Sequence, residues 1–110
     1  MRARAHPTLT RITAAAVCVL VAGSAWASDG LPAGDVAYGE YLSGDCTACH
    51  KPDGAVGIPP IVGWYPEDFA LAMQDFRDGT RKHQIMEMMA SRLDDDQIAA
   101  LAAYFASLAP

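Results

Sequence analysis

Two cysteines and a histidine lie within five residues, in the order Cys46, Cys49 and His50. Such a cluster could be a disulfide, half of a zinc site, a redox dithiol or an attachment site for haem. A disulfide would leave His50 without a role, a zinc site lacks a second ligand pair at suitable spacing, and a thioredoxin-like dithiol expects a βαβ context. Haem attachment uses all three side chains, because the thiols add to the two vinyl groups and the imidazole binds the iron. We therefore expect one covalent haem c at this cluster.

The iron of such a haem has a sixth position, and its ligand decides the function. A filled position favours electron transfer, whereas an open one would indicate a gas sensor or a peroxidase, which carbon monoxide binding would reveal. A thioether suits the iron in both oxidation states and raises its potential. The candidates are Met73, Met86, Met88 and Met89, with His83 as a rival. Met73 is expected in the core, Met88 and Met89 as gap-filling core residues near the haem, and His83 at the surface.

Four helical segments and no strand are expected to position these residues, which predicts an all-α fold. A glycine- and proline-rich stretch, 51–65, is expected to be an ordered loop. Asp94 and Gln97 have the spacing of a capping box at the start of the last helix. The expected helices run over Asp35–Gly44, with a break at Gly44-Asp45, Pro66–Gly79, His83–Ser91 and Asp94–Leu108.

The first 27 residues have the pattern of a cleaved signal peptide. Basic residues precede the apolar run 12–23, and Ala25-Trp26-Ala27 fits a signal peptidase site. We expect a single monohaem domain at residues 28–110, periplasmic and without a membrane span after cleavage. Losing three of the eight basic residues would change the net charge from −5 to −8. That acidity disfavours nucleic acid and suits a soluble protein or docking on a basic partner.

The chain resembles class I cytochromes c over nearly all of residues 28–110. The resemblance implies a fold of short helices packed around one haem, with Gly39 crossing Tyr104 or Phe105. It also implies that the Pro59 carbonyl accepts the proton of the haem histidine and that Met86 is the sixth ligand. The motifs that carry it are Gly39-x-Tyr41-Leu42, Cys46-x-x-Cys49-His50, Ile58-Pro59-x-x-x-Gly63 and Leu101-Ala102-Ala103-Tyr104-Phe105.

A narrower resemblance points to the cytochrome subunit of flavocytochrome c sulfide dehydrogenase. It implies a flavoprotein partner that binds FAD and oxidises sulfide, with the substrate chemistry on that partner's flavin. Many members of that family carry two haem domains, whereas this chain has one. The alternatives are a free, diffusible cytochrome c that carries electrons to a terminal oxidase or reductase, or a subunit without independent function. The motifs are Gly39-Glu40-Tyr41-Leu42, Ile58-Pro59, Met73-x-x-Phe76-Arg77-x-Gly79-x-Arg81 and Ile85-Met86.

Two further expectations concern activity and surface. The chain has no arrangement of acid, base or nucleophile that would make it a catalyst by itself. Ile61, Trp64 and Tyr65 follow the haem-side Pro59 closely. We expect these three side chains to cover the haem, with the alternative that they face a partner protein.

Overall fold

The computed structural model describes residues 32–109, so the expected signal peptide at residues 1–27 lies outside the described part. Within residues 32–109 the chain forms five helices and no strand, apart from one isolated bridge between Ala55 and Ile58. The all-α fold class is therefore confirmed. The helices are α1 (Val36–Leu42), α2 (Gly44–Thr47), α3 (Pro66–Asp78), α4 (Gln84–Ala90) and α5 (Asp95–Ser107).

Capping residues define the ends of the longer helices. The Asp35 side chain accepts a backbone hydrogen bond at 3.0 Å from the first turn of α1. Pro66 is the first residue of α3, and Gly79 ends that helix with a φ of 77°. Asp94 and Gln97 exchange hydrogen bonds of 2.8 and 3.0 Å, which is the capping box expected at the start of α5.

The break expected at Gly44-Asp45 is wrong, because the chain forms a further helical turn there. α1 ends at Leu42, and α2 begins at Gly44 after a single connecting residue, Ser43. The backbone N–H groups of Cys46 and Thr47 both donate to the Ser43 carbonyl, at 2.9 and 3.0 Å. Gly44 is the first residue of this turn rather than an interior one, so its poor helix propensity does not prevent it. The turn carries the first of the two cysteines.

α1 and α5 cross in direct backbone contact. A Cβ atom at Gly39 would lie 2.0 Å from the carbonyl oxygen of Ala100 and 2.7 Å from the Cβ of Tyr104. A Cβ atom at Gly34 would lie 1.9 Å from the carbonyl oxygen of Ala99. The two glycines therefore allow an approach that any side chain would prevent. The expected crossing of Gly39 with an aromatic residue of the last helix is confirmed for Tyr104.

The core lies between α3 and α5. Phe69 and Met73 of α3 are buried against Ile98, Leu101 and Phe105 of α5. The rings of Phe69 and Phe105 stack with their centroids 5.5 Å apart. Burial of each large apolar side chain contributes roughly 1.5–3 kcal/mol, so these stripes are the main source of stability visible in the helices. α1, α3 and α5 form a frame held by this core and by the glycine crossing.

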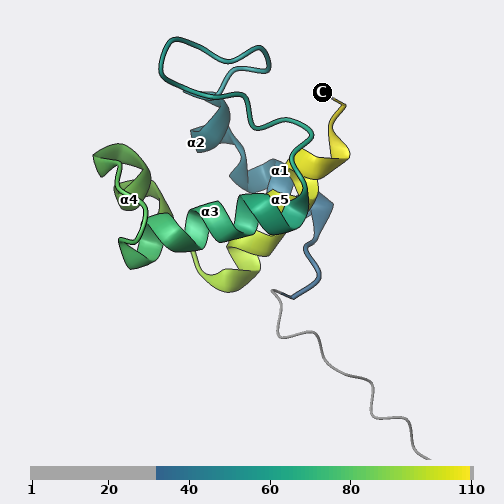
Figure 1. Ribbon diagram of the computed structural model, residues 1–110. Helices are drawn as coiled ribbons and strands as arrows, with labels where there is room; N and C mark the ends of the chain where they lie inside the picture. The colour runs from purple at the N-terminus through teal and green to yellow at the C-terminus, as the bar shows by residue number, and fades with distance from the viewer. Residues whose placement is uncertain (1–31, 110) are drawn as a thin grey trace, which may run out of the picture.

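The two short helices are attached to the frame at its edge. The backbone of α2 lies close to α1, and that of α4 lies close to α3. Ala90 of α4 is also fully buried in the core, and Cys46 of α2 packs against the core. Figure 1 shows α4 at one end of α3, while the loop 48–65 rises from α2 and returns to the start of α3. Cys46 and most of the candidate methionines therefore lie on the two short helices, and Cys49 lies in the loop after α2.

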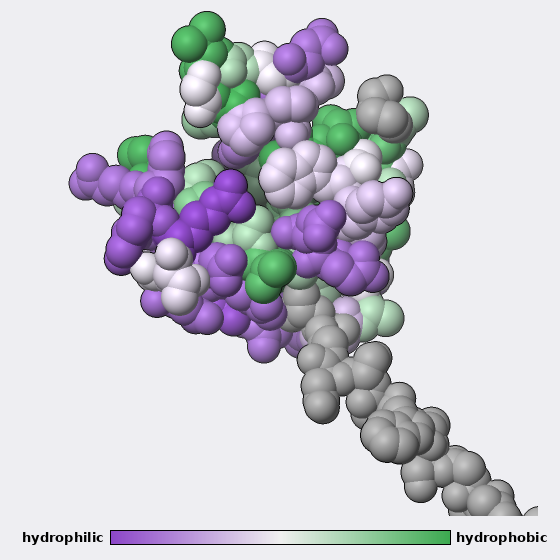
Figure 2. Space-filling view, in the orientation of Figure 1, coloured by the Kyte–Doolittle hydropathy of each residue, from purple (hydrophilic) through white to green (hydrophobic). Residues whose placement is uncertain are grey.

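The surface differs from one end of the molecule to the other. Figure 2 shows hydrophilic side chains gathered around α4 and the adjoining end of α3, and hydrophobic ones at the tip of the loop. Val56, in that loop, is fully exposed. None of the helices in the described range has the length and apolar character needed to cross a membrane.

Candidate functional site

A cavity of about 850 Å³ opens between α2, α3, α4 and the loop, and its wall includes the whole cysteine and histidine cluster. This volume lies in the range of about 300–1,000 Å³ that is usual for ligand sites. Much of the lining is apolar: Leu42, Ile58, Ile61, Trp64, Phe69, Ala72, Met73, Phe76, Ile85, Met86, Leu93 and Leu101. A space of this size beside the core suits a large, flat, apolar group.

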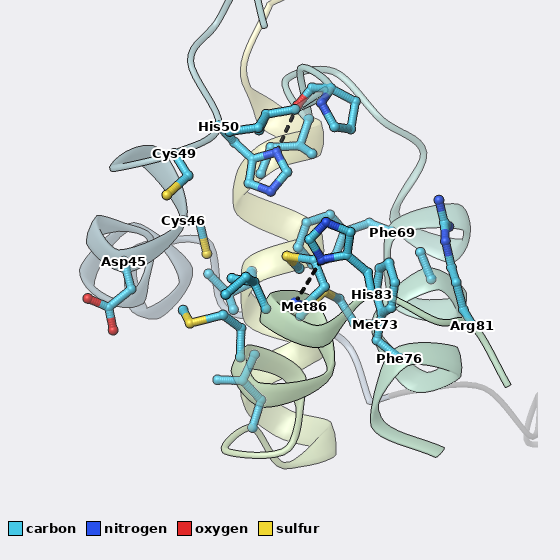
Figure 3. Close-up of a pocket in the computed structure, with 18 of the residues that line it drawn as sticks. Asp45, Cys46, Cys49, His50, Phe69, Met73, Phe76, Arg81, His83 and Met86 are labelled. Atoms are coloured by element: carbon cyan, nitrogen blue, oxygen red, sulfur yellow. Dashed lines mark hydrogen bonds between the residues drawn. The ribbon is translucent and has the colours of Figure 1, made fainter. Parts of the chain in front are cut away.

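Cys46 and Cys49 form one wall of the cavity, and both are free thiols. The two side chains lie on the same side of the site as Asp45 (Figure 3). Burial, with a smaller effect from the negative charge of Asp45, raises the pKa of Cys46 to about 11. Cys46 is therefore a neutral thiol in an apolar environment at neutral pH, available for a bond to a ligand in the cavity rather than paired with Cys49.

His50 has one ring nitrogen engaged and the other available. Its Nδ1 lies 2.7 Å from the carbonyl oxygen of Pro59. A carbonyl only accepts hydrogen bonds, so Nδ1 carries the proton and Nε2 keeps a free lone pair. Figure 3 shows the ring held from the loop side and facing into the cavity. The hydrogen bond to Pro59, which the family resemblance implied, orients Nε2 of His50 toward the cavity.

The candidate sixth ligands have separate locations. Met73 is buried in the core beside the cavity, as expected. The expected gap-filling role in the core is wrong for Met88, which is 54% exposed and does not line the cavity. Met89 lines it, but its sulfur accepts a hydrogen bond of 2.9 Å from the Arg92 guanidinium. Met86 is half-buried against the core and lies across the cavity from His50 in Figure 3.

His83 lines the same cavity, directly before α4. Its Nδ1 accepts a hydrogen bond of 3.3 Å from the backbone N–H of Met86 and so caps the first turn of this helix. The ring also lies edge-on to Phe76, with centroids 6.5 Å apart. His83 is exposed, as expected, and its contacts are those of a capping residue that holds the turn with Met86.

The aromatic segment after Pro59 divides between the cavity and the surface. Ile61 is buried and Trp64 half-buried, and both line the cavity. Tyr65 is 76% exposed and lies outside the lining. The expected covering role therefore fits Ile61 and Trp64, whereas Tyr65 is a surface residue.

Sequence reasoning assigned no role to the basic residues at the rim of the cavity. Arg81, Lys82 and Arg92 all line it, although two come from the α3–α4 connection and one from the turn after α4. Basic residues are few in this acidic chain, so their positions could have drawn attention to a binding site. That the three meet at one cavity could not be predicted from the sequence, because α4 separates Arg81 and Lys82 from Arg92.

The residues of the cavity fit a haem. The wall is largely apolar, two free thiols lie on one side, and an oriented imidazole nitrogen faces a methionine across the space. Within residues 32–109, no three His, Cys, Asp or Glu side chains gather in a way that could hold a metal ion.

Comparison with known proteins places these observations in a family. The family model for cytochrome c matches residues 36–109. The chain is 40% identical to cytochrome c-554(548) of Halomonas halodenitrificans, over 68% of this chain and 98% of that protein. It is 36% identical to the cytochrome subunit of sulfide dehydrogenase of Chlorobaculum tepidum, over 86% of this chain and 94% of that protein.

A third similarity covers only part of a longer relative. The chain is 37% identical to cytochrome c4 of Pseudomonas aeruginosa over 68% of its own length, but this is 39% of that protein. The chain therefore spans less than half of cytochrome c4, and nearly the full length of the two relatives above.

Proposed function

Because this chain belongs to the cytochrome c family, we propose that it is the haem subunit that accepts electrons from an FAD-dependent sulfide dehydrogenase in the periplasm. Family membership establishes an electron-transfer protein with covalent haem c, and the spacing of Cys46, Cys49 and His50 supports attachment at this motif. The haem iron supplies the one-electron chemistry by alternating between two oxidation states. The residues of this chain anchor the group, orient it and exclude water from it.

For the axial ligands we propose His50 and Met86. His50 has its Nδ1 proton committed to Pro59 at 2.7 Å, which leaves Nε2 to bind the iron. The position of Met86 across the cavity, and the competing contact of Met89 with Arg92, support Met86 as the partner ligand. A thioether opposite an imidazole suits reversible electron transfer better than ligand activation, because it fills the sixth position and favours the reduced iron.

The sulfide dehydrogenase assignment rests on one observation above the others. The similarity to the Chlorobaculum tepidum cytochrome subunit extends over 94% of that protein, so the relative is itself about the length of this one-haem chain. A single haem domain is therefore no departure from that relative. Because one haem offers no internal relay, its electron must come from another protein's cofactor, for which we propose a flavin.

A second candidate function is a free electron carrier. It is favoured by the similarity to cytochrome c-554(548), which is 40% identical and almost fully covered by this chain. In this case the protein would diffuse between a donor and a terminal oxidase or reductase. The site would be the same, and only the partner surface would differ.

The test is to purify the haem-loaded chain with an affinity tag from the periplasmic fraction of its native host. We expect a flavoprotein to co-purify in equal amounts, with a flavin absorbance, and sulfide to reduce the haem in this complex. The control is the same chain produced alone in another bacterium, in which sulfide should reduce the haem much more slowly.

The outcomes separate the two candidates. A haem protein recovered only as a free monomer, without flavin and with equal sulfide reactivity in both preparations, would remove the dehydrogenase proposal and leave the carrier. Carbon monoxide bound rapidly by the reduced protein would contradict a filled sixth position, and with it both candidates. Recovery from the cytoplasmic fraction alone would contradict the proposed location.

A further inference from the structure

Basic residues are scarce in this protein and gather at one place. Residues 32–109 contain five Lys and Arg side chains, Lys51, Arg77, Arg81, Lys82 and Arg92. Three of the five, Arg81, Lys82 and Arg92, line the cavity. In a chain with thirteen Asp and Glu residues, this concentration of positive charge around an apolar space indicates a negatively charged occupant.

These cations differ in how their charge is satisfied. Outside the cavity, Arg77 pairs with Asp95 at 2.7 Å. At the rim, Lys82 lies only at the limit of an ion pair, 3.9 Å from Glu87. Within residues 32–109, no carboxylate lies within ion-pair distance of Arg81.

Arg81 is nevertheless held in place. Its backbone N–H donates to the Asp75 carbonyl at 3.0 Å, which ties the loop to the end of α3. Its guanidinium lies over the Phe76 ring, 4.8 Å from the centroid. This stacking supports the side chain through its flat face and leaves the N–H edge available. A guanidinium edge is well suited to a carboxylate, which it can bind through two parallel hydrogen bonds.

The covalent haem of this family supplies such carboxylates on a defined edge. Haem carries its two propionates on the ring edge opposite the vinyl groups, and the thiols attach at the vinyl groups. Figure 3 shows Cys46 and Cys49 on one side of the cavity and Arg81 on the other. We infer that Arg81 binds a haem propionate and so sets which way the ring points.

The opposite wall agrees with this orientation. Asp45 is the one carboxylate residue in the lining, and it lies on the cysteine side in Figure 3. A propionate on that side would face a like charge, whereas on the Arg81 side it meets positive charge. Because Arg81 adds positive charge near the iron, it also favours the reduced state and raises the redox potential.

The experiment compares haem-loaded variants by two measurements, the propionate bending mode in resonance Raman spectra and the midpoint potential from redox titration. Arg81→Gln should shift the bending mode and lower the potential. Arg81→Lys should have a potential close to that of the wild type but a shifted bending mode, because lysine keeps the positive charge and cannot form the two parallel hydrogen bonds of a guanidinium. Lys51→Gln removes the same charge outside the cavity and should leave the bending mode as in the wild type.

Two results would overturn the assignment. One is an unchanged bending mode in Arg81→Gln. The other is a shift in Arg92→Gln and none in Arg81→Gln, which would place the propionates at the turn after α4. If Arg81→Gln yields no haem-loaded protein, nuclear Overhauser contacts between the propionate and Arg81 side-chain protons decide the question in the reduced wild-type protein. Their absence contradicts the inference. Neither measurement depends on the electron donor, so these results do not test the proposed flavoprotein partner.

Discussion

The Gly39→Ala substitution tests whether the close crossing of α1 and α5 stabilises this fold. A single methyl group would be added where the two helices touch. Its carbon would lie 2.0 Å from the Ala100 carbonyl oxygen, which is 1.4 Å short of an ordinary contact at 3.4 Å. Both atoms belong to or adjoin the backbone, so no side-chain rotation relieves the clash. The helices must separate, and the core beside them must loosen.

The expected cost follows from two opposing effects. Overpacking a well-packed contact destabilises by roughly 1–3 kcal/mol, and a clash with backbone falls at the upper end. Alanine is a better helix former than glycine by about 1 kcal/mol, which offsets part of this. We expect a net loss of about 2 kcal/mol. For a domain of this size, this corresponds to a fall of about 10 °C in the unfolding temperature.

The assay is guanidinium unfolding of the haem-loaded protein, followed by far-ultraviolet circular dichroism. Gly44→Ala is the matched control, because a Cβ atom there has nothing within 4 Å. That variant should keep its stability or gain up to about 1 kcal/mol, since only the helix preference changes. If Gly39→Ala is as stable as Gly44→Ala, the crossing does not constrain the fold as described.

The remaining predictions concern the site and the last helix. Replacing Cys46 and Cys49 with alanine should abolish the haem-stained band in denaturing electrophoresis, and a surviving band would contradict covalent attachment there. Met86→Ala should remove the methionine-to-iron absorption band of the oxidised protein and lower its potential. Met88 lies outside the cavity and is 54% exposed, so Met88→Ala should change neither the band nor the potential. If Met88→Ala removes the band and Met86→Ala does not, Met86 is not the ligand. Asp94→Ala removes one half of the capping box and should cost about 1 kcal/mol in thermal unfolding with an unchanged haem spectrum; an equal unfolding temperature would show that the cap is dispensable.

The features predicted correctly from the sequence are those with local causes. Pro66 begins its helix and Gly79 ends it because of their own backbone preferences, which need no knowledge of the rest of the fold. The bond between His50 and Pro59 spans only nine residues, although it was expected from a family resemblance rather than from the spacing alone. The same resemblance predicted the position of Gly39 against Tyr104, which joins residues far apart in the chain.

The features that were missed depend on how separate segments meet. Glycine usually interrupts helices, which predicts a break at Gly44, whereas in the structure Gly44 begins a new helix. Arg81 and Arg92, which precede and follow α4, lie at the same cavity only because α4 packs against the end of α3. The division between Trp64, toward the cavity, and Tyr65, toward solvent, is set by the path of a loop without regular periodicity.

The absence of backbone contact between α2 and α4 has a consequence for motion. If the haem is bonded to Cys46 on α2 and, as proposed, to Met86 on α4, it would connect these two short helices. The thioether bonds are permanent, but a sulfur-to-iron bond can release. Loss of the proposed Met86 bond would then favour a partial opening in which α4 loses its contacts with α3 and Ala90 leaves the core, while the α1–α5 crossing stays closed. Amide hydrogens of α4 would exchange through this partial opening, and those of α5 only through complete unfolding. The iron would thus lose its proposed sixth ligand, Met86, before the domain unfolds globally.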